Sequence, residues 1–221
     1  AGLGRYDDAL EVVEKDFGPM IDSQRERLQI GQVIAVILIL HELQSFERIN
    51  SLNQGTYEQC EFLGCDFSNL DISAFVFTDC RFNDCNLSMA TLNNTGFKNV
   101  NFTTCKLLGL RFDDCNAFGF AVSFDSCPLN HCSFYKTKLT NTRFTRCQMH
   151  EVEFTEADLH SAIFDACDLH FSTFERTNLE KADFRTAVNF SINPTLNRIK
   201  NAKFSRDRLA GLLDSFSIVI E

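Results

Sequence analysis

Residues 158–184 read DLHSAIFDACDLHFSTFERTNLEKADF, and within them a large apolar residue returns at every fifth position. The series alternates between leucine and phenylalanine: Leu159, Phe164, Leu169, Phe174, Leu179 and Phe184. A spacing of five matches neither the strand period of about 2 nor the helix period of about 3.6. The pattern therefore predicts a backbone whose own structural unit is five residues long.

The same spacing runs from Tyr57 to Phe112 and again from Phe124 to Phe184, and the shift between the two series predicts a two-residue bulge near 117–122. A small residue usually stands two positions before each apolar centre, as Ala162 does before Phe164. A spacing of two places both side chains on one face of an extended segment. The residue between them is usually polar, and the remaining two suit a turn. Each repeat is thus predicted to form a short extended side followed by a corner.

Such a unit cannot bury its apolar face alone, whereas stacked coils can, which is the principle of a solenoid. The alternation of leucine and phenylalanine excludes an odd number of sides, because every column would then mix the two. Two sides would leave no room for the side chains, so four sides and about 20 residues per coil are predicted. One inward column then contains only phenylalanine: Phe62, Phe82, Phe102, Phe124, Phe144, Phe164, Phe184 and Phe204.

The ten cysteines follow the same spacing. Six of them share one inward column: Cys65, Cys85, Cys105, Cys127, Cys147 and Cys167. A linear ladder of thiols lacks the clustered geometry of a metal site, so we expect free cysteines that act as small apolar residues. Free thiols are typical of a reducing compartment, which predicts a cytoplasmic location.

Several repeats match a known motif closely, namely ADLHS (157–161), CDLHF (167–171), TNLEK (177–181) and ADFRT (182–186). The sequence resembles the pentapeptide-repeat family, whose motif is a small residue, Asp or Asn, Leu or Phe, and two variable residues. The resemblance covers about residues 57–189 and implies a right-handed, four-sided β-helix. Gyrase-directed members of that family look like double-stranded DNA in size and charge and bind type II topoisomerases, and some protect gyrase from quinolones. The resemblance brings no catalytic residue.

The two ends depart from the repeat. Residues 1–44 show helical spacing and are predicted to form a cap, an assembly element or an appended segment. Residues 45–56 are predicted to form a strand that leads into the repeat region of residues 57–205. Residues 206–221 are predicted to form a C-terminal helix that caps the open end of the solenoid or forms a homodimer seam. The apolar residues for either role are Leu209, Leu212, Leu213, Phe216 and Ile218.

Charge and hydropathy narrow the possible partners. The net charge of −9 argues against nonspecific nucleic-acid binding and against an anionic membrane surface. The longest apolar run, Val33–Leu40, is too short to span a membrane. One side of the predicted solenoid, the side of Phe134 and Phe154, collects acidic residues that Arg111, Lys136 and Arg176 interrupt. These candidate partner-binding residues are Asp71, Asp113, Asp114, Glu153, Glu156 and Glu175.

The sequence predicts no enzyme, because no nucleophile–base pair, phosphate-binding glycine loop or carboxylate pair is recognisable. His150 and His170 are expected to stack one coil apart at a corner, with too few other ligands for a metal site. No cofactor is expected, and a solid-cored prism offers no obvious pocket. Two noncatalytic functions remain open. One is a DNA mimic that binds DNA gyrase or another DNA-binding protein, and the other is a rigid scaffold whose partner binds a flat side or the N-terminal segment.

Overall fold

The computed structural model describes residues 44–216 and 218. The chain divides into two compact units, Ala1–Phe46 and Glu47–Glu221. The predicted helical segment of residues 1–44 therefore lies almost wholly outside the described residues. Within them, no helix has the length and apolar character needed to cross a membrane.

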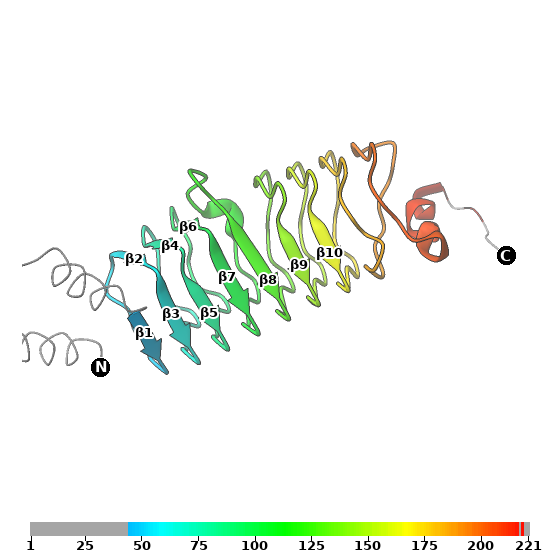
Figure 1. Ribbon diagram of the computed structural model, residues 1–221. Helices are drawn as coiled ribbons and strands as arrows, with labels where there is room; N and C mark the ends of the chain where they lie inside the picture. The colour runs from blue at the N-terminus through cyan, green and yellow to red at the C-terminus, as the bar shows by residue number, and fades with distance from the viewer. Residues whose placement is uncertain (1–43, 217, 219–221) are drawn as a thin grey trace, which may run out of the picture. The chain divides into compact units, whose positions relative to one another are not determined.

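The second unit is a β-solenoid built from parallel strands (Figure 1). The larger sheet contains, in spatial order, β1 (Gln44–Glu47), which crosses the boundary between the two units, β3 (Cys60–Leu63), β5 (Arg81–Asn83), β7 (Val100–Thr103), β8 (Val122–Asp125), β9 (Arg143–Thr145) and β10 (Ile163–Asp165). The smaller sheet contains β2 (Thr56–Glu58), β4 (Val76–Thr78) and β6 (Gly96–Lys98). The strand predicted for residues 45–56 is confined to β1, and an irregular segment leads from it to β2.

Strand register confirms the predicted coil length. Phe62 pairs with Phe82, and Phe82 with Phe102, at a separation of 20 residues. Phe102 then pairs with Phe124, a separation of 22 residues, and the spacing of 20 resumes from Phe124 to Phe144. The two additional residues fall between Asn116, whose N–H donates to Thr95, and Ala121, whose N–H donates to Phe97. The bulge predicted near 117–122 is thus a loop inserted into one coil.

A left-handed backbone conformation recurs at every fifth residue and turns the chain. Asp79, Asp84, Met89, Asn94 and Asn99 all have φ between 54° and 60°. Each lies two positions after an inward apolar centre, so a 20-residue coil has four such corners and four short extended sides. At many corners the centre's carbonyl also accepts a hydrogen bond from the N–H three residues later, as Leu159 does from Ala162 at 3.0 Å. A short turn therefore closes each side.

We name the four sides by their inward centres. Side A carries Phe62, Phe82, Phe102, Phe124, Phe144, Phe164 and Phe184, and side B carries Phe67, Leu87, Leu107, Leu129, Met149 and Leu169. Side C carries Ile72, Leu92, Phe112, Phe134, Phe154 and Phe174, and side D carries Tyr57, Phe77, Phe97, Leu139, Leu159 and Leu179. Apart from Tyr57, every one of these residues is buried.

The core is a set of stacked rings. On side A the centroids of Phe62 and Phe82 lie 4.5 Å apart, and those of Phe144 and Phe164 lie 5.0 Å apart. Rings of side C meet those of side A edge-on, as Phe154 meets Phe144 at 6.2 Å. This combination of offset stacks along the axis and edge-to-face contacts across it is favourable for aromatic pairs. Phe204 continues the side A stack, 5.4 Å from Phe184, but is only half-buried.

The thiols lie in the same core. Nine of the cysteines are buried, and Cys115, beside the inserted loop, is half-buried. All ten are free. The buried residues include the whole predicted column from Cys65 to Cys167.

The C-terminal segment forms 3-10 helices, η2 (Arg206–Leu212) and η3 (Asp214–Phe216), where the sequence predicts an α-helix. η2 lies against the last coil, since the Gly211 carbonyl accepts a hydrogen bond from Ile192 at 2.8 Å. A Cβ atom at Gly211 would collide with the Phe190 carbonyl oxygen, so only glycine permits this contact. The docking of so short a segment onto the coil end, rather than its own helical hydrogen bonds, decides its conformation. η1 (Phe112–Asp114) is a third 3-10 turn.

Candidate interaction surfaces

Side chains fill the core of the described coils, so the candidate sites in this part of the chain lie on the outer surface. Two hollows in the described region are shallow grooves between neighbouring coils, of about 410 Å³ and 290 Å³. The first is lined mainly by polar and charged residues of the last coils, and the second lies beside the inserted loop. Among residues 44–216 and 218, no group of three or more His, Cys, Asp or Glu side chains could hold a metal ion.

The acidic residues predicted as a partner-binding side do share side C and its corner, but bases neutralise several of them. Arg111 pairs with Asp113 at 2.7 Å and with Asp114 at 3.1 Å. Lys136 and Arg176, from the coils on either side, both contact Glu156, at 3.5 Å and 3.0 Å. These two cations lower the pKa of the Glu156 carboxyl, with the hydrogen bond from Arg176 as the largest cause.

The other three acids of side C have no basic partner within 4 Å among the described residues. Asp71 accepts hydrogen bonds from the N–H and hydroxyl of Ser73, which lower the pKa of its carboxyl. Glu153 accepts a hydrogen bond from Ser133 at 3.3 Å, and Glu175 is exposed. Side C thus carries isolated acidic residues between ion pairs and lacks a continuous acidic stripe.

An exposed aromatic ring stands on the inserted loop. Phe118 is 81% exposed, the highest value among the large apolar side chains of the described region. The Asn116 side chain accepts a hydrogen bond from the Phe118 N–H at 2.9 Å, and Gly119 supplies the left-handed turn with φ +73°. The Nζ atom of Lys98 lies 5.5 Å from the centroid of the Phe118 ring, within cation–π range. Phe120, in contrast, turns inward and meets the ring of Phe112 at 6.4 Å.

The predicted histidine pair lies at the corner after side B. The rings of His150 and His170 are 5.6 Å apart. Nε2 of His150 lies 3.0 Å from Asp168, whose carboxyl also accepts a hydrogen bond from Asn189 at 2.8 Å. These contacts connect consecutive coils, which indicates a structural role.

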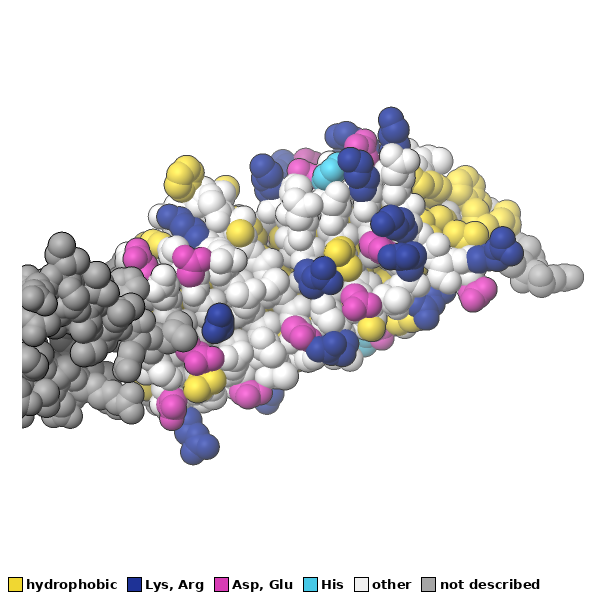
Figure 2. Space-filling view, in the orientation of Figure 1, with side chains coloured by type: hydrophobic (Ala, Val, Ile, Leu, Met, Phe, Trp, Pro, Cys, Tyr) yellow, Lys and Arg dark blue, Asp and Glu magenta, His cyan; other side chains and the backbone are white. Residues whose placement is uncertain are grey.

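The C-terminal end presents apolar side chains to solvent. Leu209 is 42% exposed, Phe216 47% and Ile218 55%, whereas Leu212 and Leu213 are half-buried. Leu196, in the last coil, is 53% exposed. In Figure 2 this group is the yellow area beside the C-terminal end of the solenoid. The segment therefore covers part of the last coil and leaves an apolar surface of its own.

The periodic corners, the 20-residue register and the filled core are the properties expected of stacked five-residue repeats. The sequence pattern that describes the pentapeptide repeat region matches residues 117–184. Residues 117–184 thus form a pentapeptide-repeat region. No curated protein sequence matches this pentapeptide-repeat protein at a significant level.

One solved structure shares the fold, and a second aligns more loosely. A trypsin-treated variant of QnrB1, a plasmid-mediated fluoroquinolone resistance protein, aligns with a TM-score of 0.56 and 15% identity over 81% of this chain and 98% of that chain. HetL, a pentapeptide repeat protein involved in heterocyst differentiation regulation in the cyanobacterium Nostoc, aligns with a TM-score of 0.34 and 11% identity over 81% of this chain and 95% of that chain. At this identity, the QnrB1 match shows that the fold is shared.

The five-residue period predicts the inserted loop, whereas the exposed ring on it was not predicted. A usable signal was present: Phe118 stands outside the inward positions of the repeat, in the stretch where the five-residue phase is interrupted. A large apolar residue that the repeat does not need for its core is a candidate for contact with another molecule.

Proposed function

We propose that this pentapeptide-repeat protein is a noncatalytic protein-interaction module and that Phe118 anchors its partner. The 81% exposure of Phe118 carries the proposal. Exposed aromatic side chains are frequent hot spots of protein interfaces, where a few residues supply most of the binding energy. We further propose that the solenoid coil is right-handed and four-sided. We also propose that the protein is located in the reducing cytoplasm.

The local structure supports an anchoring role because the loop is held in place. The hydrogen bond to Asn116, the packing of Phe120 and the N–H donated by Ala121 to Phe97 at 2.9 Å fix both ends of the loop. The adjoining groove of about 290 Å³, lined in part by Gly119, Phe120 and Lys138, can accept a side chain of the partner. A loop that is ordered before binding loses little conformational entropy on binding.

The test compares protein capture by the full chain and by two single variants. Phe118→Ala should reduce the capture of a specific partner at least tenfold, as expected for a hot spot. Met89→Ala is the matched control, because Met89 is 62% exposed at a different corner and should leave capture unchanged. If the two variants capture the partner equally well, Phe118 is not the anchor. If removal of residues 1–44 abolishes capture instead, the protein is a scaffold that recruits its partner through its N-terminal segment.

A second candidate is the DNA mimic that binds DNA gyrase or another basic DNA-binding protein. It is supported by the fold shared with QnrB1 and by Glu153 and Glu175 on side C, which have no basic partner within 4 Å among the described residues. Purified protein at micromolar concentration should then alter supercoiling by gyrase, less so at high salt. Glu153→Lys combined with Glu175→Lys should abolish the effect. If the native protein leaves supercoiling unchanged, or the double variant acts as well as the native protein, the DNA-mimic proposal fails.

We also propose that the protein forms a homodimer through an end, preferably the C-terminal one. The exposed Leu209, Phe216 and Ile218 would be covered in such an arrangement. Sedimentation equilibrium should show a dimer that Phe216→Asp converts to a monomer. A native protein that stays monomeric at tens of micromolar would contradict this arrangement.

A further inference from the structure

In the C-terminal half of the solenoid, the balance of basic and acidic residues differs between the sides. Between residues 125 and 203, sides A and D with their corners carry eight basic and five acidic residues. Sides B and C with their corners carry two basic and five acidic residues over the same length. The net charge of −9 for the whole chain therefore conceals a basic surface, which we call the A–D surface. Its basic residues are Lys138, Arg143, Arg146, Lys181, Arg185, Arg198, Lys200 and Lys203.

Ion pairs on the A–D surface leave an excess of free cations. Three of its acids are neutralised, since Arg146 pairs with Asp125 at 2.5 Å, Arg185 with Asp183 at 2.7 Å and Arg198 with Glu180 at 2.8 Å. Five cations of the surface have no acidic partner within 4 Å among the described residues. They are Lys138, Arg143, Lys181, Lys200 and Lys203.

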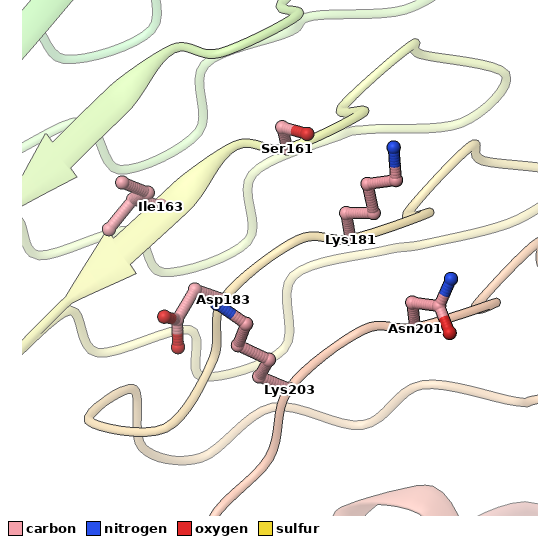
Figure 3. A pocket seen from close by; sticks show the side chains of 6 residues that line it. All are labelled: Ser161, Ile163, Lys181, Asp183, Asn201 and Lys203. Atoms are coloured by element: carbon pink, nitrogen blue, oxygen red, sulfur yellow. The ribbon is translucent and has the colours of Figure 1, made fainter.

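Two of these lysines line the groove of about 410 Å³ between the last coils (Figure 3). Lys181 and Lys203 share its wall with the neutral polar side chains of Ser161 and Asn201. Asp183 also lines the groove, but both of its carboxylate oxygens are held by Arg185, at 2.7 Å to 3.1 Å. The charge that the groove presents to a ligand is consequently positive.

The free cations at and beside the groove, Lys181, Lys200 and Lys203, belong to the last coils. Lys138 and Arg143 lie two coils earlier, and the coil between carries Asp158 and Asp165 on sides A and D and no lysine or arginine there. Figure 2 shows dark blue side chains gathered over the C-terminal half of the solenoid. Lys181 and Asn201 occupy the same corner of consecutive coils, and Lys203 follows Asp183 on the outward face of side A. Consecutive coils are one strand spacing apart, about 4.8 Å, so the cations extend along the solenoid as well as across the corner.

We propose that the A–D surface binds the phosphate backbone of a nucleic acid. Lysine and arginine side chains together with neutral hydroxyl and amide groups are the usual contacts to phosphate and sugar oxygens. The overall negative charge does not prevent this contact, because the Debye length of about 8 Å at physiological salt screens the acids of the opposite sides. Contacts to phosphates do not distinguish between nucleotide bases. Binding should therefore depend on the salt concentration and little on the nucleotide sequence.

Two other anionic partners fit the surface less well. An anionic bilayer would need apolar side chains among the cations, but the only apolar residue that lines the groove is Ile163. The exposed apolar residues Leu196, Leu209 and Phe216 belong instead to the C-terminal end. A second copy of the chain would have to present its acidic side C to the A–D surface. Arg111, Lys136 and Arg176 already neutralise three of the acids there, so little negative charge is left for such a contact.

The experiment measures the fluorescence anisotropy of a labelled DNA duplex of about 30 base pairs with the full chain. Binding in the micromolar range at 50 mM salt should weaken as salt rises, with a logarithmic slope of about −3 to −5, one unit for each phosphate neutralised. Lys181→Ala combined with Lys203→Ala should weaken binding at least tenfold and reduce that slope by about two. Lys136→Ala, on side C, is the control and should bind as the native protein does. Both variants replace exposed side chains, and equal melting temperatures would show that the fold is retained.

Three results with the duplex would overturn the proposal. They are no binding by the native protein at 50 mM salt, equal losses in the double variant and the Lys136→Ala control, or a slope near zero. Vesicles that contain a phosphatidylglycerol fraction form the second arm. If they bind the protein more tightly than the duplex, with the same dependence on Lys181 and Lys203, the ligand is an anionic lipid surface and the assignment to nucleic acid is wrong. A single-stranded oligonucleotide of the same sequence separates a preference for duplex from binding to any phosphate chain.

Discussion

At the scale of single residues, the fold depends on a backbone conformation that most side chains avoid. Corner residues such as Asp84, Lys136, Asn141 and Glu156 have φ between 54° and 62°. For residues other than glycine this left-handed region costs about 1 kcal/mol or more, and asparagine and aspartate adopt it most readily. The repetition of hydrogen bonds and ring stacks in every coil offsets that cost. A solenoid can thus use ordinary residues at corners where a single isolated turn would select glycine.

We predict that Asn141→Val lowers the free energy of unfolding by about 1–2 kcal/mol, because a β-branched residue is strained at φ 62°. Asn141 is exposed, so lost packing contributes little. Asn141→Gly should be close to neutral, since glycine adopts positive φ freely but adds entropy to the unfolded chain. Urea denaturation followed by circular dichroism measures both. If valine and glycine have the same effect, corner strain does not limit stability.

At the scale of the elements, the strands are too short to be stable alone, and the aromatic columns join them. β8, β9 and β10 contain three or four residues each, yet consecutive coils bring Phe124, Phe144 and Phe164 into one stack with centroid distances of 5.3 Å and 5.0 Å. Each ring contacts the coil before it and the coil after it. Stability should therefore be shared between neighbouring coils, as in other repeat proteins.

Phe144→Ala tests the column. The ring is fully buried, so the variant should lose about 3–5 kcal/mol of unfolding free energy, through lost burial and the cavity left between two coils. Phe118→Ala removes the same atoms from an exposed loop and should change stability by less than about 0.5 kcal/mol. Chemical denaturation of both variants against the native protein gives the comparison. Equal losses would mean that the rings of side A do not hold the coils together.

At the scale of the whole molecule, the side chains in the core of the solenoid are shielded from solvent, and the reactivity of the cysteines measures that shielding. Nine thiols are buried, and burial raises the pKa of the Cys132 and Cys127 thiols to about 12. A thiol must be both accessible and ionised to react. Burial removes access for all nine thiols in the folded solenoid, and for Cys127 and Cys132 the raised pKa also disfavours the thiolate at neutral pH. Reaction therefore requires that coils open.

An aromatic disulfide reagent at pH 7.5 should therefore label few cysteines in the native protein and all ten after denaturation in guanidinium. Cys115 should react first, because it is the only half-buried cysteine. The absorbance of the released thiolate counts the reacted groups over time. Rapid labelling of most cysteines under native conditions would show that the side chains are not held inside the solenoid.

Most of the fold could be predicted from the chain because the signal repeats. The pairing of Phe102 with Phe124 follows from counting residues, and so does the position of the inserted loop. The C-terminal segment could not be derived in the same way. Leu209, Leu212 and Leu213 fit an α-helical face, but the contact of Gly211 with the Phe190 carbonyl selects 3-10 turns. That contact depends on where the last coil ends in space, which a local pattern does not contain.

The amino-acid sequence by itself determined the coil: a five-residue period of large and small inward side chains can be buried in very few ways, and each additional repeat excludes alternatives. Only the tertiary structure decided what the surface presents. It showed that Arg111, Lys136 and Arg176 neutralise three of the acids of side C and that Phe118 points outward. It also showed that Lys181 and Lys203 line one groove, where Asp183 is paired with Arg185. The physical reason is that burial follows the periodicity of the chain, whereas an ion pair depends on side-chain rotamers and on which side chains come close in space. Lys136 and Arg176 each contact Glu156 from a residue 20 positions away, whereas Arg185 pairs with Asp183 only two positions away.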